Sequence, residues 1–211
     1  MIPTKKEWIQ ALDDRHGIEF QKKISSTTVA VCGLGGLGSN IAISLARAGI
    51  GKLILIDFDK VDITNLHRQQ YKANQIGMCK TEALQNNLKE INPYLETKIH
   101  TICLDESNAK DVLADADIIC EAFDNAEAKA NIVNFVLSEM PDKYIVAASG
   151  MAGLDSANLI KTRKVSKRFY LCGDEVSDIK DGIGLVSTRV MLCAAHQAHT
   201  VLRIIAEEYE V

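Results

Sequence analysis

A glycine-rich turn set between an apolar strand and an amphipathic helix is the feature that most limits what this chain can fold into. The run at 29–32 is short, apolar and rich in β-branched residues, which is typical of a buried parallel strand. Gly33, Gly35 and Gly38 follow with the spacing G-x-G-x-x-G, and apolar side chains recur at helical spacing over 39–48. The sequence therefore predicts a strand, a tight turn and a helix in direct succession.

An acidic residue completes this unit as a candidate nucleotide site. A second apolar run at 52–56 ends at Asp57, about 20 residues after Gly38, where an acid in dinucleotide-binding folds binds ribose hydroxyls. The glycines let the backbone approach a phosphate closely, and the helix N-terminus directs unpaired N–H groups at an anion. The full order of strand, turn, helix, strand and acid favours a bound ligand over a glycine turn without one.

The rest of the chain alternates in the same way. Further strands are predicted at 96–103, 117–122 and 144–148, and further helices at 79–91, 107–114, 125–138 and 188–207. This alternation predicts an α/β fold with a Rossmann-like, mostly parallel sheet and helices on both of its faces. We expect residues 1–211 to form a single nucleotide-binding domain, in which 1–27 are a polar, helical N-terminal extension.

The amino-acid composition limits the cellular compartment and the kinds of partner that we expect for this protein. Hydrophobic residues make up 47% and charged residues 25% of the chain, as in ordinary soluble proteins. A formal net charge of −4 weighs against a broad nucleic-acid-binding surface. No apolar run approaches the length of a membrane span and the first residues lack a signal-peptide core, so we expect a cytoplasmic location.

The cysteines indicate a reduced protein without a structural zinc site. None of the six cysteines forms a C-x-x-C pair, so zinc is predicted to be absent. Four of them lie in or beside apolar runs and are expected to be buried thiols. Cys172 lies in a polar segment, which suggests an exposed thiol, but no neighbouring His or paired Cys indicates a lowered pKa. Its chemical role stays open.

A basic cluster after the second strand points to chemistry at phosphates. Arg68 follows that strand, Lys80 begins the next predicted helix, and Asp124 follows the strand at 117–122, at the edge where such sheets bind ligands. Two cations compensate the charge of a triphosphate, and a carboxylate holds Mg²⁺ with retained waters. Alone, Lys80 would be a solvated helix residue and Arg68 a surface ion-pair partner. Their combined spacing favours a functional site.

These motifs resemble the adenylating enzymes of ubiquitin-like proteins. The matching segments are 33–39, Asp57-x-Asp59, Asn65-Leu66-His67-Arg68-Gln69, Gly77-x-x-Lys80, Asn92-Pro93 and Asp124-Asn125-x-x-x-Lys129. The resemblance is strong over residues 28–150 and looser over the remainder. Residues 45–51, 121–125 and 148–153 are similar to the short ThiF branch, which is linked to thiamine biosynthesis.

The resemblance implies a role for each matching residue. The backbone of Gly35 and Gly36 would lie against the nucleotide, and Asp57 would bind the ribose. Asn65, Arg68 and Lys80 would bind the triphosphate of ATP, and Asp124 would coordinate magnesium. The implied catalytic residues are Arg68, Lys80 and Asp124, and the implied nucleotide-binding residues are Gly33, Gly35, Gly36, Gly38, Asp57, Asp59, Asn65, Arg68, Lys80, Asp124 and Asn125.

The implied reaction joins a protein carboxylate to AMP. The C-terminal carboxylate of a small, ThiS-like sulfur carrier protein, typically ending in Gly-Gly, would attack the α-phosphorus of ATP and release pyrophosphate. A carboxylate is ionised at neutral pH, so no general base is needed, and catalysis is alignment plus stabilisation of phosphate charge. The resemblance also implies a homodimer that uses the apolar faces of the terminal helices, and a mobile lid at 163–183. From composition alone that segment is equally well a plain surface loop.

Some family features are missing or altered. Larger members carry two C-x-x-C pairs for zinc, and this chain has none. Arg15 is the only nearby match to the Arg-x-x-Arg that reaches into a partner's site, so an arginine supplied in trans is doubtful. Lys129 replaces an Arg, which keeps the charge and loses bidentate geometry. No cysteine occupies the thioester position of ubiquitin-activating enzymes.

Three alternative functions stay open. A nicotinamide-dependent oxidoreductase is compatible with the glycine turn and Asp57 alone. A nucleotide-binding scaffold without adenylation is a second alternative, which intact Arg68, Lys80 and Asp124 oppose. A tRNA threonylcarbamoyladenosine dehydratase uses the same adenylation logic, but its RNA substrate favours a basic surface. The sequence names neither the carrier nor the sulfur donor, and it leaves the oligomeric state open.

Overall fold

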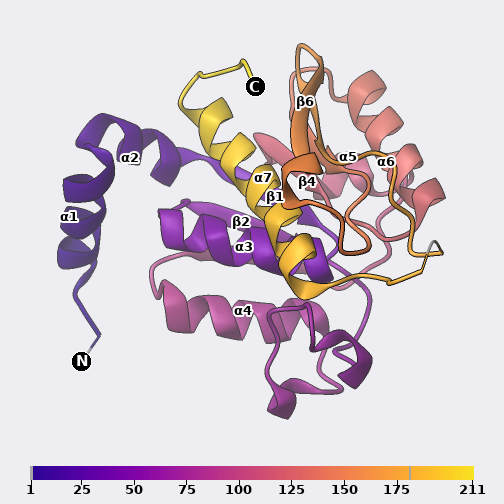
Figure 1. The fold of residues 1–211 in the computed structure, drawn as a ribbon. Helices are drawn as coiled ribbons and strands as arrows, with labels where there is room; N and C mark the ends of the chain where they lie inside the picture. Colours follow the sequence, from indigo (N-terminus) through magenta and orange to yellow (C-terminus); the bar gives the residue numbers. More distant parts are fainter. Residues whose placement is uncertain (1, 181) are drawn as a thin grey trace.

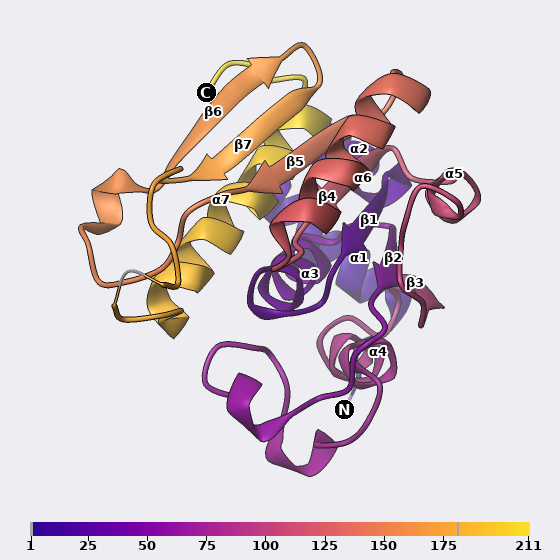
Figure 2. The ribbon, with the colours of Figure 1, turned by 90° about the vertical axis from the view of Figure 1, so that its right-hand side faces the viewer.

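The computed structural model describes residues 2–180 and 182–211 and contains a seven-stranded sheet of order β3-β2-β1-β4-β5-β7-β6. The strands are β1 (Thr28–Cys32), β2 (Lys52–Ile56), β3 (Glu96–His100), β4 (Ile118–Glu121), β5 (Tyr144–Ala148), β6 (Lys161–Ser166) and β7 (Phe169–Gly173). All neighbouring strands are parallel except β6 and β7, which form an antiparallel hairpin at one edge (Figure 2). The predicted Rossmann-like, mostly parallel sheet is confirmed.

Helices cover both faces of this sheet (Figure 1). They are α1 (Lys5–His16), α2 (Ile18–Ser26), α3 (Gly36–Ala48), α4 (Lys80–Ile91), α5 (Ala109–Val112), α6 (Ala126–Glu139) and α7 (Ser187–Ile205). One apolar core lies between the sheet and α3, α4 and α7, and a second lies on the opposite face under α5 and α6. Within the described residues, no helix is both long and apolar enough to cross a bilayer.

The strand order reverses between β1 and β4, and the region outside the carboxyl ends of these two strands is here called the crevice. From β1 the chain passes through α3 to β2 on one side, whereas β4 pairs with β1 on the other side. Ligands of open α/β sheets bind at such a reversal of strand order, outside the carboxyl ends of the strands. The glycine turn leaves β1 at this point, and the turn that carries Asp124 leaves β4 beside it.

Several predicted elements have different bounds. The helix predicted over 39–48 is α3, which begins earlier, at Gly36, because the backbone within the glycine turn is already helical. The predicted strand at 96–103 ends at His100, and the predicted helix at 107–114 is a single turn, α5. The N-terminal extension is two helices, because Gly17 adopts a φ of 83° that breaks the helix between α1 and α2.

The segment at 163–183 is not one continuous loop. Its first part belongs to the β6–β7 hairpin, and of the described residues that follow, 174–180, 182 and 183 lie outside regular structure. Two of the charged residues that suggested a loop, Arg163 and Lys164, belong to β6, an edge strand whose residues are exposed or half-buried. An edge strand keeps one side in water, so a polar composition does not exclude it.

Cys172 is buried, which corrects the expectation of an exposed thiol. Its side chain is fully inaccessible on β7, next to α7. Burial raises the pKa of the Cys172 thiol to about 11, although weak hydrogen bonds with Thr162 and Thr200 act in the other direction. A thiol in this environment is not a reactive nucleophile at neutral pH.

Candidate active site

The glycine turn is shaped by contacts that only glycine permits. Gly33 adopts a φ of 89°, and its N–H donates to the carbonyl of Ile56 at 2.8 Å. A Cβ atom on Gly38 would lie 1.8 Å from the carbonyl oxygen of Gly33, so any larger residue would push the helix off the strand. The turn therefore fixes the start of α3 at the carboxyl end of β1.

The N-terminus of α3 is open to an anion. Its N-cap residue is Gly35, and within the described residues no side chain caps the helix. The first N–H groups of a helix have no partner inside the helix and carry a partial positive charge. An oxygen-rich anion such as a phosphate can satisfy them.

Asp57 ties the glycine turn to the end of β2. Its Oδ2 accepts the N–H of Leu34 at 2.6 Å, and its Oδ1 accepts the N–H of Asp59 at 2.7 Å. The residue is only 8% exposed. Each carboxylate oxygen has two acceptor positions, so Asp57 can still accept from a ribose hydroxyl while it holds the turn.

Lys80 lies beside the two acidic residues. Its Nζ is 2.7 Å from Oδ2 of Asp59 and 3.8 Å from Oδ2 of Asp57, and the lysine is 5% exposed. The backbone N–H of Lys80 also donates to the carbonyl of Asp59, so the first residue of α4 is anchored to the end of β2. The predicted cation is therefore adjacent to the predicted ribose-binding acid.

Arg68 lies over the glycine turn from the other side. Its Nη2 donates to Oδ1 of Asn65 at 3.1 Å, and a Cβ atom on Gly36 would lie 3.5 Å from Cγ of Arg68. Burial lowers the pKa of Arg68, and the charge of Asp124 opposes this shift. Its Nε atom is buried and, among the described residues, has no hydrogen-bond partner. A buried donor without a partner points to a missing acceptor.

Three polar residues that the sequence did not single out brace this loop against α3. Asn40 donates from Nδ2 to the carbonyls of Gly36 and Arg68, and Gln70 donates from Nε2 to Oδ1 of Asn40. The hydroxyl of Tyr71 donates to the carbonyl of Leu34 at 2.7 Å. No signal of this contact is present in the sequence, because Asn40 is spaced with Ser44 and Arg47 on the polar side of the predicted helix and its partners lie about 30 residues further along the chain.

The turn between β4 and α6 brings Asp124 to the same crevice. A Cβ atom on Gly33 would lie 2.8 Å from the carbonyl oxygen of Ala122, so this turn packs directly on the glycine turn. Asp124 is exposed, and Asn125 caps α6 by accepting the N–H of Ala128 at 2.9 Å. The capping contact gives Asn125 a structural task next to its predicted nucleotide contact.

Lys129 is paired with a buried acidic residue. Its Nζ binds both carboxylate oxygens of Glu121, at 2.7 and 2.6 Å, and Glu121 is fully buried. Burial raises the pKa of Glu121, and Lys129 opposes the shift. Sequence reasoning missed Glu121 because an acid that ends a strand gives no sign of its partner.

The arrangement fits a nucleoside triphosphate. The open start of α3, the unpartnered Nε of Arg68 and the ammonium of Lys80 are donors for phosphate oxygens, and Asp57 is an acceptor for ribose. Within the part of the chain that the structure describes, no three metal-ligating side chains converge. A magnesium site at Asp124 would thus need phosphate oxygens and water, which is how Mg²⁺ is bound in most nucleotide sites.

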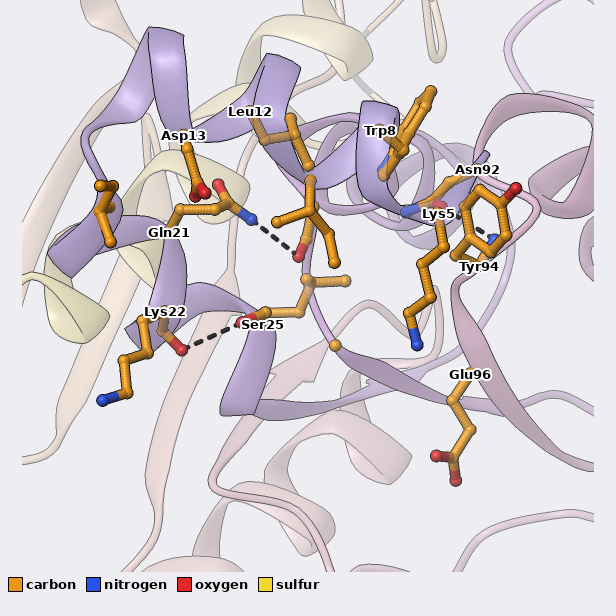
Figure 3. Close-up of a pocket in the computed structure, with 15 residues that line it drawn as sticks. Lys5, Trp8, Leu12, Asp13, Gln21, Lys22, Ser25, Asn92, Tyr94 and Glu96 are labelled. Atoms are coloured by element: carbon orange, nitrogen blue, oxygen red, sulfur yellow. Dashed lines mark hydrogen bonds between the residues drawn. The ribbon is translucent and has the colours of Figure 1, made fainter. Parts of the chain in front are cut away.

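A hollow elsewhere in the molecule lies at the amino ends of the strands, opposite the edge of the sheet that carries the candidate nucleotide site. It has a volume of about 500 Å³ and lies between the helices α1 and α2 and residues 49–51 (Figure 3). Because residues 49–51 precede β2, the hollow lies at the amino ends of the strands. Arg15 is on α1, so it is not part of the crevice of its own chain.

The fold defines an α/β protein of the Rossmann-like class, with a mostly parallel sheet. The pattern that defines the ThiF family matches residues 10–211, and the chain belongs to this family. The resemblance to adenylating enzymes of ubiquitin-like proteins is confirmed by this match and by the relatives below.

Curated relatives are longer proteins. "Adenylyltransferase and sulfurtransferase MOCS3" of Caenorhabditis briggsae is 39% identical over 121 residues, which are 57% of this chain and 30% of the relative. "Ubiquitin-like modifier-activating enzyme 5" of the same species is 37% identical over 62% of this chain and 33% of the relative. "Adenylyltransferase and sulfurtransferase UBA4" of Vanderwaltozyma polyspora is 27% identical over 94% of this chain and 46% of the relative. The matched part thus spans less than half the length of each of these relatives.

Solved structures share the fold. The tRNA N6-threonylcarbamoyladenosine dehydratase TcdA of E. coli, in complex with AMP, has a TM-score of 0.85 at 20% identity, over 99% of this chain and 98% of that one. E. coli MccB with ATP has a TM-score of 0.71 at 21% identity, over 96% of this chain and 62% of that one. At this level of identity the likeness establishes the architecture.

Proposed function

We propose that this protein adenylates a carboxylate with ATP, and that its substrate is the C-terminus of a small ubiquitin-like carrier protein. The observation that supports the proposal is the position of three groups around the glycine turn. Arg68 packs on Gly36, Lys80 lies beside Asp57, which holds the turn, and the charge of Asp124 acts on Arg68. A nicotinamide enzyme needs a glycine turn and an acid but has no use for these three groups around the phosphates.

The reaction requires positioning more than proton transfer. An oxygen of the carrier's carboxylate forms a bond to the α-phosphorus of ATP, and the bond from that phosphorus to the bridging oxygen breaks. Pyrophosphate leaves with the electron pair, and the product is a carrier acyl-adenylate. The carboxylate is already ionised, so the protein has to align it and stabilise the negative charge that develops on the phosphates.

Each residue has a defined task in this proposal. Asp57 binds the ribose, and the backbone of Gly35 and Gly36 lies against the phosphates. Arg68 donates from its unpartnered Nε, and Lys80 neutralises charge from the opposite side. Asp124 would hold a magnesium ion, which supplies further positive charge to the phosphates when bound.

We propose a ThiS-like sulfur carrier with a Gly-Gly end as the substrate, in thiamine biosynthesis. The motifs at 45–51, 121–125 and 148–153 support this choice, since they are similar to the short ThiF branch. A homodimer that uses the terminal helices is part of the same proposal. Light scattering of the purified protein measures that assembly directly.

A second candidate is adenylation of the threonylcarbamoyl carboxylate on tRNA. It is favoured by the likeness in fold to E. coli TcdA, with a TM-score of 0.85 over 99% of this chain. The net charge of −4 opposes it, because a tRNA-binding surface is usually basic.

Exchange of labelled pyrophosphate into ATP separates these functions. The purified protein is incubated with ATP, Mg²⁺ and either a ThiS-like carrier from the same genome or threonylcarbamoylated tRNA. We expect exchange with the carrier, and none with a carrier that lacks its last two residues. Exchange with the tRNA alone would establish the second candidate, and NAD(H) binding without ATP binding would overturn both.

A further inference from the structure

A buried ion pair spans the turn that carries Asp124. Glu121 ends β4 and is fully buried, and its two carboxylate oxygens bind Nζ of Lys129, in the second turn of α6, at 2.7 and 2.6 Å. Oε1 of Glu121 also accepts the N–H of Phe123 at 2.7 Å. The carboxylate therefore contacts the chain on both sides of Asp124.

Asp124 itself depends on this turn for its direction. Its side chain is exposed, and none of the side-chain hydrogen bonds found among the described residues involves it. Its backbone, by contrast, lies between Phe123, held by Glu121, and Asn125, which caps α6. The geometry of the 121–129 turn thus decides where the Asp124 carboxylate stands relative to Arg68.

The turn is anchored to the rest of the site as well. Nε2 of Gln197, a fully buried residue of α7, donates to the carbonyls of Glu121 at 2.9 Å and Val146 at 3.1 Å. On the other side, Gly33 leaves no room for a Cβ atom next to Ala122. A movement of Glu121 would therefore change the distance between Asp124 and the glycine turn.

Stability alone does not explain a charged pair at this place. Removing two charges from water costs about as much free energy as their attraction returns, and well-packed apolar side chains often stabilise as well or better. A carboxylate with several hydrogen bonds does what an apolar side chain cannot, because it holds the N–H of Phe123 on one side of Asp124 and the ammonium of Lys129 on the other.

We propose that Glu121 and Lys129 are positioning residues, which hold Asp124 in place to bind a magnesium–phosphate group in the crevice. The inference rests on the proposed function, because it assigns that task to Asp124. Glu121 and Lys129 act through the turn and do not touch the nucleotide.

The test compares three variants with the wild-type protein. Glu121→Gln with Lys129→Met removes both charges at once and leaves no lone buried charge. Lys129→Arg keeps the charge and the reach, and serves as the conservative variant. Val136→Ala truncates a side chain of α6 that is 1% exposed and lies away from the turn, so it is a control for lost stability.

Two readouts are measured on each protein. The first is amide hydrogen exchange of residues 122–125 without any ligand, which reports the order of the turn. The second is the affinity for a fluorescent ATP analogue in EDTA and during titration with Mg²⁺. In the double variant we expect faster exchange, unchanged affinity in EDTA, and a half-saturating Mg²⁺ concentration raised by roughly 10- to 100-fold, the effect of losing outer-shell support of a metal site.

The outcomes are distinguishable. Lys129→Arg and Val136→Ala should both keep the wild-type response to Mg²⁺. An unchanged Mg²⁺ response in the double variant overturns the inference, whether or not exchange of the turn is faster. If the wild-type protein does not bind the ATP analogue with Mg²⁺, the proposed function is wrong. If amide exchange of residues 122–125 is also unchanged in the double variant, Glu121 does not order the turn.

Discussion

At the scale of single residues, the two cations of the crevice are held in different ways. Lys80 is paired with acidic residues of the chain, whereas Arg68 has a buried Nε without a partner among the described residues. Arg68 is therefore poised for an incoming acceptor, and Lys80 must share its charge between protein carboxylates and ligand.

Arg68→Ala and Lys80→Ala should each reduce pyrophosphate exchange strongly. A loss of roughly 2–4 kcal/mol of transition-state stabilisation is expected for a contact to developing phosphate charge. Exchange assays give the rates, and circular dichroism checks the fold. Lys98→Ala is the matched control, because Lys98 forms an exposed ion pair with Asp115. Rates near those of the wild-type protein in both site variants would contradict the assignment.

Asp124→Asn should separate turnover from binding. The amide keeps the size of the side chain and loses the charge that attracts Mg²⁺, while the ribose contact at Asp57 is untouched. We expect nucleotide affinity in EDTA to be unchanged and the Mg²⁺-dependent exchange rate to fall. The measurement is a Mg²⁺ titration of both quantities. A normal Mg²⁺ dependence would mean that Asp124 has a structural task.

At the scale of elements, the packing of α3 on β1 sets the site. Gly38→Ala should prevent nucleotide binding and lower stability, because the new Cβ atom would meet the carbonyl oxygen of Gly33 at 1.8 Å. Gly184→Ala is the matched control, since nothing lies within 4 Å of a Cβ atom there. Thermal unfolding and binding of the ATP analogue are the measurements. Wild-type behaviour of Gly38→Ala would show that the close packing is not needed.

The connection between β7 and α7 depends on an ionised Asp174. Burial disfavours its charge, but the N–H groups of Ser177 and Val176, the Ser177 hydroxyl and Arg189 outweigh burial and lower the pKa of Asp174 to about 2. A carboxyl group with a pKa lower in the folded than in the unfolded state stabilises above its unfolded pKa, near 4, and this contribution disappears as the pH falls towards 2.

Asp174→Asn should therefore cost about 2 kcal/mol of unfolding free energy at pH 7 and much less at pH 2. Urea denaturation of the wild-type protein and the variant between pH 2 and pH 7 gives the difference in unfolding free energy. The contributions of the other carboxylates cancel in this difference. A difference that does not depend on pH would mean that the Asp174 charge does not stabilise the fold.

At the scale of the whole molecule, the candidate lid is shorter than the sequence suggested. Arg163 and Lys164 are in strand β6, so we expect trypsin to cut there slowly with or without ligand. The stretch between β7 and α7 stays a candidate lid, and Lys180 is an exposed cleavage site in it. Cleavage after Lys180 should slow only when ATP and the carrier are both present. Equal rates in all states would leave the stretch as an ordinary loop.

The sequence by itself determined the parts of this protein that follow from local spacing. Short apolar runs placed the central strands, and period-3.6 patterns placed the helices α4, α6 and α7, within a few residues. The glycine spacing marked the turn at β1. Strand order reversal then brought Asp57, Arg68, Lys80 and Asp124 to one edge, as expected from parallel strands.

Only the tertiary structure decided which side chains are paired and which are free. Cys172 is buried because β7 lies under α7, and a polar neighbourhood in the sequence could not reveal that. Lys129 binds Glu121, and Asn40 braces a loop about 30 residues away in the chain. Periodicity encodes which face of an element is apolar, but a buried polar side chain finds its partner across elements, and that pairing exists only once the sheet and helices have packed.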